Sequence, residues 1–378
     1  MSRVWIFMLA IIVGLASCSD EPDKPSQPAK RTILIYMIAT NSLGSNSRDQ
    51  QDLAEMDQAV TNGALNGCRL LVYRVANDGQ APTLFEIKLG KNGKVEHQPL
   101  LTYGNASGIS VTPERMRQVI ADMKTEAPAN EYGLILWSHG TGWARSITTK
   151  PLSTTTLKDF GEDNGSTMSL TDLAAGIPTG VFEWIYADVC YMACVEVAYE
   201  LRNHCHYFVG YTTEIPAQGM PYDVTLPLLC KHTSQLVEAC RATYNYYNAQ
   251  EGQNRTFSGV VVDCSHMDEL ATTCHSIQEQ ALPLESLKGL QYYNINSSHF
   301  FYDFLQYYQT ICPDEMQTQL LNAYNKVVID KMSTALIFNR ILIDPNKFSG
   351  LSTYIKGTSP GINEQYYTQL SWNKAVFP

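Results

Sequence analysis

Short apolar stretches alternate with predicted helical stretches along most of the chain. Residues 33–39 and 70–73 are strand-forming and carry no charge, which is typical of strands buried on both faces of a parallel sheet. Residues 50–60 are predicted to form a helix. A second helix is predicted to begin at Thr112-Pro113, because threonine caps a helix and proline suits its first position.

The dipeptide Asn92-Gly93 predicts a β-hairpin between strands at 83–89 and 95–97, because a type I′ turn needs positive φ at both central residues. Further strands are predicted at 133–137, 182–186, 207–210 and 258–262. Strands that alternate with helices in this way indicate an α/β fold, in which helices flank both faces of a mostly parallel sheet.

The C-terminal part of the chain has a weaker pattern, with a helix predicted at 316–331 and a strand at 348–355. No internal repeat or linker interrupts the sequence after Thr32. We therefore predict one continuous unit. Its core covers residues 32–278, and a C-terminal subdomain, residues 279–378, packs on the core and returns a strand to it.

The N-terminus is predicted to be an export signal, residues 1–17, with an apolar run at 4–14 too short for a permanent membrane helix. The sequence Leu-Ala-Ser-Cys at 15–18 resembles a bacterial lipobox. That resemblance implies cleavage before Cys18, a diacylglycerol on its thiol and an acyl chain on its amine, and more than one chain anchors stably. An ordinary signal peptide that ends in small residues remains the alternative.

Residues 18–31 contain three prolines among polar residues and are predicted to form a flexible tether. Acidic residues just after the cysteine resemble surface-export signals of some lipoproteins. We therefore expect a lipid-anchored protein of the bacterial cell envelope, held at the outer membrane and exposed at the surface.

Charge and cysteine content narrow the class of protein. A formal net charge of −10 argues against nucleic-acid binding, which needs a basic face. The cysteines other than Cys18 are odd in number and lack C-x-x-C pairs, which argues against a disulfide framework or a zinc site. Most are predicted to be small buried residues, and at least one to be a reactive thiol.

Two predicted strands end in residues that could carry nucleophilic catalysis. His139 follows the strand at 133–137, and Cys190 follows the strand at 182–186 and precedes a helix predicted at 192–202. Ligands of such sheets bind beyond the carboxyl ends of the strands, and a helix N-terminus favours a thiolate. Each residue alone is more often structural: the histidine a capped strand end, the cysteine buried and inert.

These residues lie in two motifs that resemble a known family. Residues 136–143, Leu-Trp-Ser-His-Gly-Thr-Gly-Trp, resemble the histidine motif of clostripain-type peptidases. Residues 188–192, Asp-Val-Cys-Tyr-Met, resemble their nucleophile motif, and the order of the motifs is also that of caspases, legumains and gingipains. The resemblance covers nearly all of 32–378. It implies a caspase-like fold and a Cys190–His139 dyad without an obligatory third residue.

The resemblance also implies cleavage after arginine or lysine, because Asp188 corresponds to the acid of the family's S1 pocket. The alternative is that Asp188 caps the following helix. Backbone N–H groups of Gly140 and Cys190 are candidate oxyanion donors. Thr141 stands where the family often has glycine, and Thr213-Glu214 stands where relatives commonly have serine and glutamate, so the shape of the pocket remains open.

A polar loop at 144–167 follows the histidine motif. Family members are often activated by self-cleavage here after a basic residue, and the candidates are Arg145, Lys150 and Lys158. A plain surface loop is the alternative. No cofactor or metal is required for this chemistry; Ca²⁺ remains open because some relatives need it, although no EF-hand spacing is present.

We therefore predict a cysteine endopeptidase that acts through a thioester acyl-enzyme on peptides or proteins with a basic P1 residue. We expect a monomer. A transpeptidase built on the same thioester remains open. The alternative from another class is a catalytically silent surface lipoprotein that binds peptides or protein partners.

Overall fold

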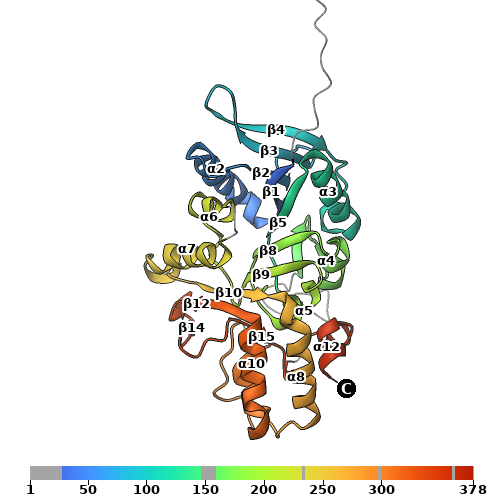
Figure 1. Ribbon diagram of the computed structural model, residues 1–378, viewed down its shortest axis with the longest axis vertical. Coiled ribbons are helices and arrows are strands. Elements are labelled where there is room, and N and C mark those ends of the chain that lie inside the picture. Colours follow the sequence, from blue (N-terminus) through green and yellow to red (C-terminus); the bar gives the residue numbers. More distant parts are fainter. Residues whose placement is uncertain (1–27, 146–158, 232–234, 296–298, 360–361, 378) are drawn as a thin grey trace, which may run out of the picture.

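A central sheet of nine strands runs through the molecule, with helices on both faces (Figure 1). The computed structural model describes residues 28–145, 159–231, 235–295, 299–359 and 362–377. In spatial order the strands are β12 (Val328–Ser333), β10 (Ser258–Asp263), β9 (Cys205–Tyr211), β8 (Phe182–Asp188), β5 (Ala129–Trp137), β1 (Ala29–Ala39), β2 (Cys68–Ala76), β3 (Thr83–Leu89) and β4 (Val95–Thr102). The five strands from β9 to β2 are parallel, and the outer strands pair antiparallel. The predicted α/β class is confirmed.

Two groups of helices cover the sheet (Figure 1). One face packs against α2 (Arg48–Thr61), α6 (Tyr222–Leu229) and α7 (Leu236–Asn248). The other packs against α3 (Pro113–Glu126), α4 (Leu170–Gly176), α5 (Val195–Leu201) and α8 (Met267–Glu279). Within the described residues, no helix is long and apolar enough to cross a membrane.

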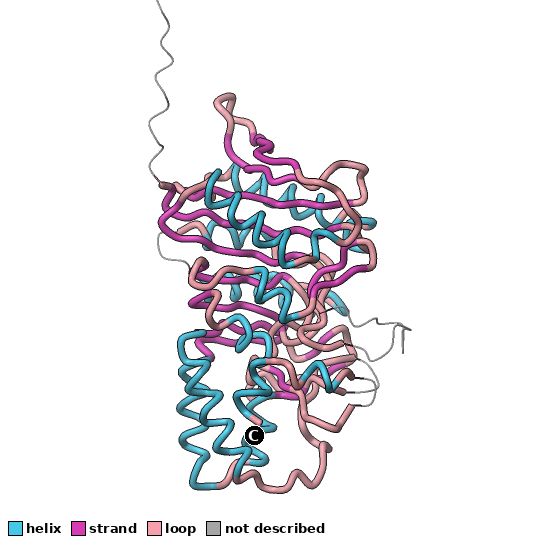
Figure 2. The backbone as a smooth tube through the Cα atoms, turned by 90° about the vertical axis from the view of Figure 1, so that its right-hand side faces the viewer, coloured by secondary structure: helices cyan, strands magenta, loops and turns pink. Residues whose placement is uncertain are grey.

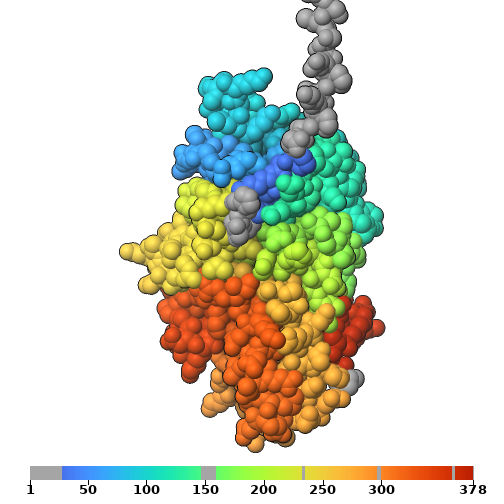
Figure 3. All heavy atoms as spheres, viewed as in Figure 1, coloured from blue at the N-terminus to red at the C-terminus, as the bar shows by residue number. Residues whose placement is uncertain are grey.

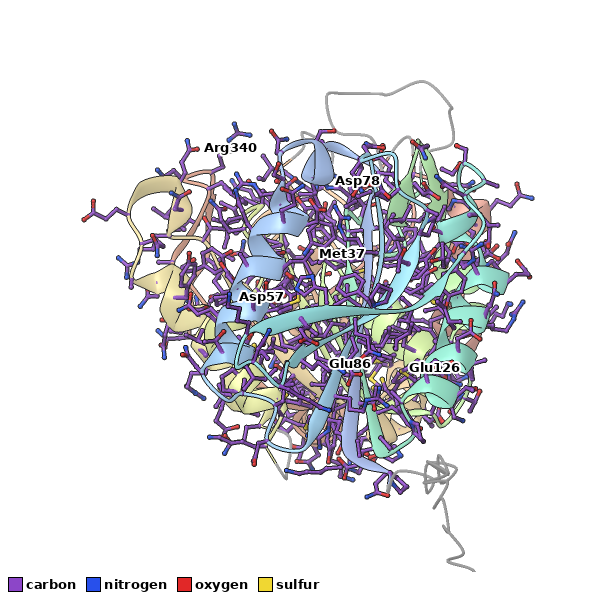
Figure 4. The ribbon with its side chains drawn as sticks, turned by 90° about the horizontal axis from the view of Figure 1, so that it is seen from above. Met37, Asp57, Asp78, Glu86, Glu126 and Arg340 are labelled. Atoms are coloured by element: carbon purple, nitrogen blue, oxygen red, sulfur yellow. The ribbon has the colours of Figure 1, made fainter. Side chains whose placement is uncertain are left out.

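Strand β1 lies at the middle of the sheet, and Ile33 to Ala39 are fully buried, as the uncharged sequence predicts. Alternate side chains enter two separate hydrophobic clusters, one on each face: Leu34, Tyr36 and Ile38 on one side, and Ile33, Ile35 and Met37 on the other. Met37 pairs in register with Trp137 of β5 and lies in the interior of the molecule (Figure 4). The carboxyl ends of β1 and β5 are therefore neighbours.

The predicted hairpin at Asn92-Gly93 is confirmed, but its turn differs from the expected type. Only Gly93 has a positive φ, of 75°, and the Gly90 N–H donates to the Lys94 carbonyl at 2.8 Å. This geometry is a three-residue loop with glycine in the left-handed position, rather than a two-residue type I′ turn. The β3–β4 hairpin forms one end of the molecule (Figure 1).

The C-terminal part occupies the opposite end, where orange and red residues cover the lower face (Figure 3). Helices α8 and α10 (Gln317–Val327) lie side by side there (Figures 1 and 2). The helix predicted at 316–331 was too long, because the chain leaves α10 at Val327 and continues as the edge strand β12, antiparallel to β10. Tertiary pairing outweighs helical periodicity at this boundary.

The strand predicted at 348–355 was also too long. Only β15 (Ser352–Thr353) forms, and it pairs with β11 (Tyr302–Asp303). Short elements complete this part of the described chain: α9 (Phe304–Ile311), β13 (Leu336–Ile337), β14 (Ile341–Leu342), α11 (Glu364–Tyr367) and α12 (Ser371–Val376).

Gly133→Ala is expected to lower the free energy of unfolding by about 1–3 kcal/mol. A Cβ at this position of β5 would overlap with the indole ring of Trp184, the buried residue opposite it on β8. Urea denaturation followed by circular dichroism measures the change. Gly104→Ala is the matched control, because a Cβ there meets nothing within 4 Å. Equal midpoints for the two variants would contradict the overlap.

Candidate active site

A pocket of about 350 Å³ opens at the carboxyl edge of the parallel strands. Its walls come from segments that directly follow β1, β5, β8 and β9 in the chain. Its lining includes four of the candidate residues, His139, Gly140, Asp188 and Cys190, together with Leu43 and Glu214. The expectation that a site forms beyond the strand ends therefore agrees with the position of this pocket.

Cys190 follows the last residue of β8 by two positions and begins a tight turn. Tyr191 has a φ of 60°, a left-handed conformation that is rare for a bulky side chain and is concentrated at functional sites. The turn is held by the Tyr191 N–H, which donates to the Thr213 carbonyl at 3.0 Å, and by stacking of its ring on Phe301. The Ile215 N–H donates to the Cys190 Sγ at 3.5 Å, so the thiol faces the segment after β9.

The thiol of Cys190 is protonated at neutral pH in this conformation. Burial, with the nearby Glu214 carboxylate as a second cause, raises its pKa to about 12. The expected help from a helix N-terminus is absent, because α5 begins at Val195 rather than at Met192 and a helix dipole acts only within its first turn. Formation of the thiolate therefore requires a proton acceptor in the pocket.

His139 follows β5 by two positions, and its side chain lines the same pocket as Cys190. Its carbonyl accepts the Gly161 N–H at 2.8 Å, and the Thr141 N–H donates to the Asp159 carbonyl at 2.9 Å. These two backbone hydrogen bonds join the histidine motif to residues 159–161. Two loops separated by 50 residues in sequence bring the candidate base and nucleophile to one cavity.

Gly140 is the first candidate oxyanion donor. Gly140 pairs with Phe160 in an isolated antiparallel β-bridge. The two hydrogen bonds of this bridge are made by the His139 carbonyl and the Thr141 N–H, so the bridge does not use the Gly140 N–H. A Cβ would overlap with Val189 and lie 3.0 Å from the Asp159 carbonyl oxygen, which explains why glycine stands here. Gly140 and Cys190 both line the pocket, as two amides that hold one oxyanion must.

Asp188, the last residue of β8, lies in the pocket wall with its carboxylate anchored from a distant segment. The Met220 N–H donates to both oxygens at 3.0 Å, and the Tyr222 hydroxyl donates to Oδ2 at 3.1 Å. The alternative that Asp188 caps the next helix is wrong, because Cys194 is the N-cap of α5. Burial raises the pKa of Asp188 to about 7, against the effect of these hydrogen bonds.

Of the three predicted processing residues, the structure describes Arg145. Its Nε lies 3.0 Å from the Asp159 Oδ2, its guanidinium lies over the Tyr366 ring, and its carbonyl accepts the Asn363 N–H at 2.9 Å. Arg145 and Asp159 lie on either side of residues 146–158 within this loop, and both are held beside the histidine motif. Lys150, Lys158 and the predicted lipidation residue Cys18 lie outside the described residues.

One pocket contact could not be found from the sequence: the Ser42 hydroxyl lies 2.8 Å from the His139 Nε2. The only local signal is that Ser42 comes soon after the end of β1. Among the described residues, no group of three or more His, Cys, Asp and Glu side chains is arranged to hold a metal ion. The buried Asp163 accepts hydrogen bonds from the Thr40 hydroxyl and from the Ser110 N–H.

Comparison with known proteins identifies the family. The sequence profile of the clostripain family matches residues 35–343. The chain belongs to the clostripain family. A comparison with curated proteins gives no match.

Solved structures of clostripain-family enzymes share the fold over nearly the whole chain. A secreted C11 cysteine protease from Bacteroides thetaiotaomicron, iotapain, superposes with a TM-score of 0.81 at 25% identity and covers 93% of this chain and 99% of its own. An inactive zymogen C11 protease from Parabacteroides distasonis gives 0.80 at 30% identity, with the same coverage. A secreted Bacteroides thetaiotaomicron C11 protease in complex with an irreversible peptide inhibitor gives 0.77 at 28%, covering 92% and 99%.

The predicted caspase-like α/β fold is thus confirmed, and so is the enzyme class: this clostripain-family chain is a cysteine protease.

Proposed function

We propose that the chain is an endopeptidase that cleaves peptide bonds after arginine or lysine, with Cys190 as nucleophile and His139 as its proton-transfer partner. The observation that carries the proposal is that Cys190, His139 and the Asp188 carboxylate line one pocket. A nucleophile, a base and an acid that attracts a basic side chain are the groups that such a reaction needs.

The reaction begins when His139 accepts the thiol proton and the Cys190 sulfur attacks the scissile carbonyl carbon. The N–H groups of Gly140 and Cys190 donate to the oxyanion that forms. His139 then returns the proton to the leaving amine, which departs and leaves a thioester on Cys190. Water, deprotonated by His139, hydrolyses the thioester and restores the thiol. Because the resting thiol is neutral, proton transfer to His139 accompanies attack.

Asp188 supplies the preference for a basic residue. Its carboxylate lies in a largely buried wall, where a guanidinium or ammonium group pairs more strongly than in water. Binding of the cation favours the ionised form of Asp188, whose pKa of about 7 otherwise leaves a protonated fraction at neutral pH.

Activation by self-cleavage after Arg145, Lys150 or Lys158 completes the proposal. The neutral, partly buried thiol of Cys190 fits an uncleaved precursor with low reactivity. The fixed positions of Arg145 and Asp159 support it as well, because a cut between them leaves the histidine motif joined to residues 159–161. The peptide-cleavage assay described below, run with and without Ca²⁺, would show whether activity requires this ion.

For the location, we propose lipid attachment through Cys18 to the bacterial outer membrane, with the enzyme acting as a monomer on peptides or proteins outside the cell. Two of the similar structures are described as secreted proteases, which supports an extracytoplasmic location.

The test is an assay of the purified chain against fluorogenic peptides that end in arginine, lysine, aspartate or asparagine. We expect cleavage after arginine or lysine, at least about 100-fold faster than after the acidic or neutral residues. His139→Ala is expected to abolish it. Absence of cleavage of any peptide, with and without Ca²⁺ and after proteolytic nicking at 146–158, would favour the silent peptide-binding lipoprotein instead.

A further inference from the structure

The short hairpin formed by β13 and β14 carries apolar side chains on the face that solvent reaches. Leu336 and Leu342 are directly opposite partners on the two strands, and their exposed fractions are 42% and 72%. The next pair, Ile337 and Ile341, is buried. A hairpin at a protein surface commonly alternates between apolar residues that face the core and polar residues that face water. The leucine pair breaks this alternation, so the exposed face of the hairpin offers apolar surface to a partner.

The hairpin is held in a fixed conformation. Phe338 and Asn339, in its turn, have φ values of 48° and 56°. The Arg340 N–H closes the turn by donating to the Ile337 carbonyl at 2.8 Å. A left-handed conformation at a bulky residue such as Phe338 persists only when its surroundings enforce it. The Thr256 hydroxyl holds the turn from outside, because it accepts the Phe338 N–H at 2.8 Å.

Hydrogen bonds connect the hairpin with the wall of the pocket. The Thr213 N–H, next to the pocket residue Glu214, donates to the Ser258 Oγ at 3.0 Å. The Phe257 N–H, beside Ser258, donates to the Thr334 Oγ1 at 3.0 Å, and the Thr334 N–H donates to the Phe257 carbonyl at 2.9 Å. Strand β13 begins two residues after Thr334. The hairpin therefore continues the pocket wall that follows β9.

Arg340 indicates that the exposed side of the hairpin lies near the pocket. Arg340 and Leu342 are both exposed and flank the buried Ile341, so they lie on the same side of β14. Burial raises the pKa of Glu214, which lines the pocket, and the nearby Arg340 guanidinium acts in the opposite direction. Figure 4 shows Arg340 at the same edge of the sheet as Asp78, which comes just after the carboxyl end of β2.

The order of the strands indicates which part of a bound peptide meets the hairpin. The sheet places β5, β8, β9, β10 and β12 in this spatial order, so His139 lies to one side of Cys190 and the hairpin, which follows β12, lies toward the other. In the proposed reaction His139 protonates the leaving amine, which begins the part of the substrate after the scissile bond. The part before the scissile bond therefore extends toward the hairpin. Three strand spacings, about 14 Å, separate β8 from β12, and an extended peptide spans them with about four residues.

We propose that the exposed face of the β13–β14 hairpin binds an apolar side chain of the substrate, about the fourth residue before the scissile bond. The inference rests on the proposed function, because the direction of the substrate follows from the role of His139. Contact with Leu336 and Leu342 removes apolar surface of both partners from water. The positive charge of Arg340 beside them disfavours a second basic residue at this position of the substrate.

Peptides with a single arginine before the scissile bond test this surface. One leucine is moved through the second to sixth positions before the bond, and through the first to fourth positions after it, in a background of serine, glycine and alanine. Leucine at one of the third to fifth positions before the bond is expected to raise kcat/KM by about 10-fold over serine, mainly by lowering KM, because its burial favours binding. Leucine after the bond is expected to change kcat/KM by less than about 2-fold.

Substitutions on the hairpin locate the preference. Leu342→Gln is expected to reduce it to less than about 2-fold and to leave the kinetics of the serine peptide unchanged. Leu342→Met keeps an apolar side chain and is expected to retain the preference. Leu89→Gln is the matched control, because Leu89 is also an exposed leucine, with an exposed fraction of 51%, but lies on β3 near the other edge of the sheet. We expect the control to keep the parental preference.

Binding without turnover separates the inference from the proposed function. Fluorescence anisotropy of labelled peptides with the Cys190→Ala chain is expected to give a Kd about 10-fold lower for the leucine peptide than for the serine peptide, and Leu342→Gln is expected to abolish the difference. A parent that cleaves nothing after arginine or lysine, but whose Cys190→Ala form binds the leucine peptide through Leu342, would overturn the proposed function and leave the docking surface supported.

Three outcomes would overturn the role of the hairpin. The first is a leucine preference that is equal in the parent and in Leu342→Gln. The second is a preference found only after the scissile bond, or at no position. The third is a change from dimer to monomer in Leu342→Gln, measured by sedimentation, with unchanged peptide kinetics, which would make the leucine pair an interface between two copies of the chain.

Discussion

Cys190→Ala is expected to reduce kcat/KM for peptides with a basic P1 residue by roughly 10⁵-fold, to the background of the assay. The reason is chemical: without the sulfur no thioester forms, and the oxyanion donors alone accelerate hydrolysis far less. The substitution removes one atom beside Ile215 in the pocket wall, so the fold is expected to persist. Fluorogenic peptide hydrolysis measures the loss, and circular dichroism checks the fold.

Cys240→Ala is the matched control for Cys190. The Cys240 thiol also has a pKa raised to about 12 by burial, but Cys240 lies on α7 and does not line the pocket. We expect this variant to keep parental kcat/KM. A peptide ending in arginine with a thiol-reactive group should label only Cys190, as located by mass spectrometry. Cleavage that survives in Cys190→Ala would refute the assignment of the nucleophile.

Asp188→Asn is expected to lower kcat/KM for arginine and lysine substrates by about 100-fold, equivalent to about 3 kcal/mol. The amide can still accept the Met220 N–H, so the pocket keeps its shape while its charge is lost. Substrates with a neutral P1 residue are expected to change little. Steady-state kinetics with matched peptides measures the difference, and equal effects on both classes would contradict a charge-pairing role.

The same carboxylate predicts a pH dependence. Burial raises the pKa of Asp188 from its ordinary value to about 7, so the group is mostly neutral below pH 7 and ionised above it. The parent's ratio of kcat/KM for arginine over a neutral P1 substrate is therefore expected to rise several-fold between about pH 6 and 8. Asp188→Asn should give a flat ratio. A flat ratio in the parent would show that Asp188 is already ionised at pH 6.

Asp52→Asn controls for removal of a buried acid near the pocket. Its carboxylate accepts the Trp137 Nε1–H at 2.6 Å, and burial, with Asp188 as a second cause, raises its pKa to about 9. Asp52 is thus neutral at pH 7, and its replacement by asparagine removes no charge. We expect the preference for basic residues to remain in this variant.

Much of the fold follows from local pattern. An uncharged run such as 33–39 can be stable only between two apolar layers, and its burial on both faces agrees with that. The positions of His139 and Cys190 just after such strands were enough to bring them to one edge, because parallel strands share the direction of their carboxyl ends. The motifs around these residues also indicated the clostripain family, and the family match over residues 35–343 confirms that prediction.

Boundaries were less predictable where pairing overrides propensity. The residues after Val327 have a helical pattern, yet they form the edge strand β12, because β10 offers an unpaired edge that only the assembled sheet creates. The start of α5 moved to Val195 because the turn after Cys190 is held by the distant Thr213 and Ser352. No local signal contains these partners.

By itself, the sequence determined the class of fold and the family, and it singled out His139 and Cys190 as the candidate catalytic pair. The tertiary structure decided which groups surround them: the bonds from Met220 and Tyr222 to Asp188, the left-handed turn at Tyr191, and the contact between Ser42 and His139. The physical reason is the distance along the chain over which each signal acts. Periodicity and turn chemistry act over a few residues, whereas the polarity and proton affinity of a pocket depend on which distant segments the order of the strands brings together.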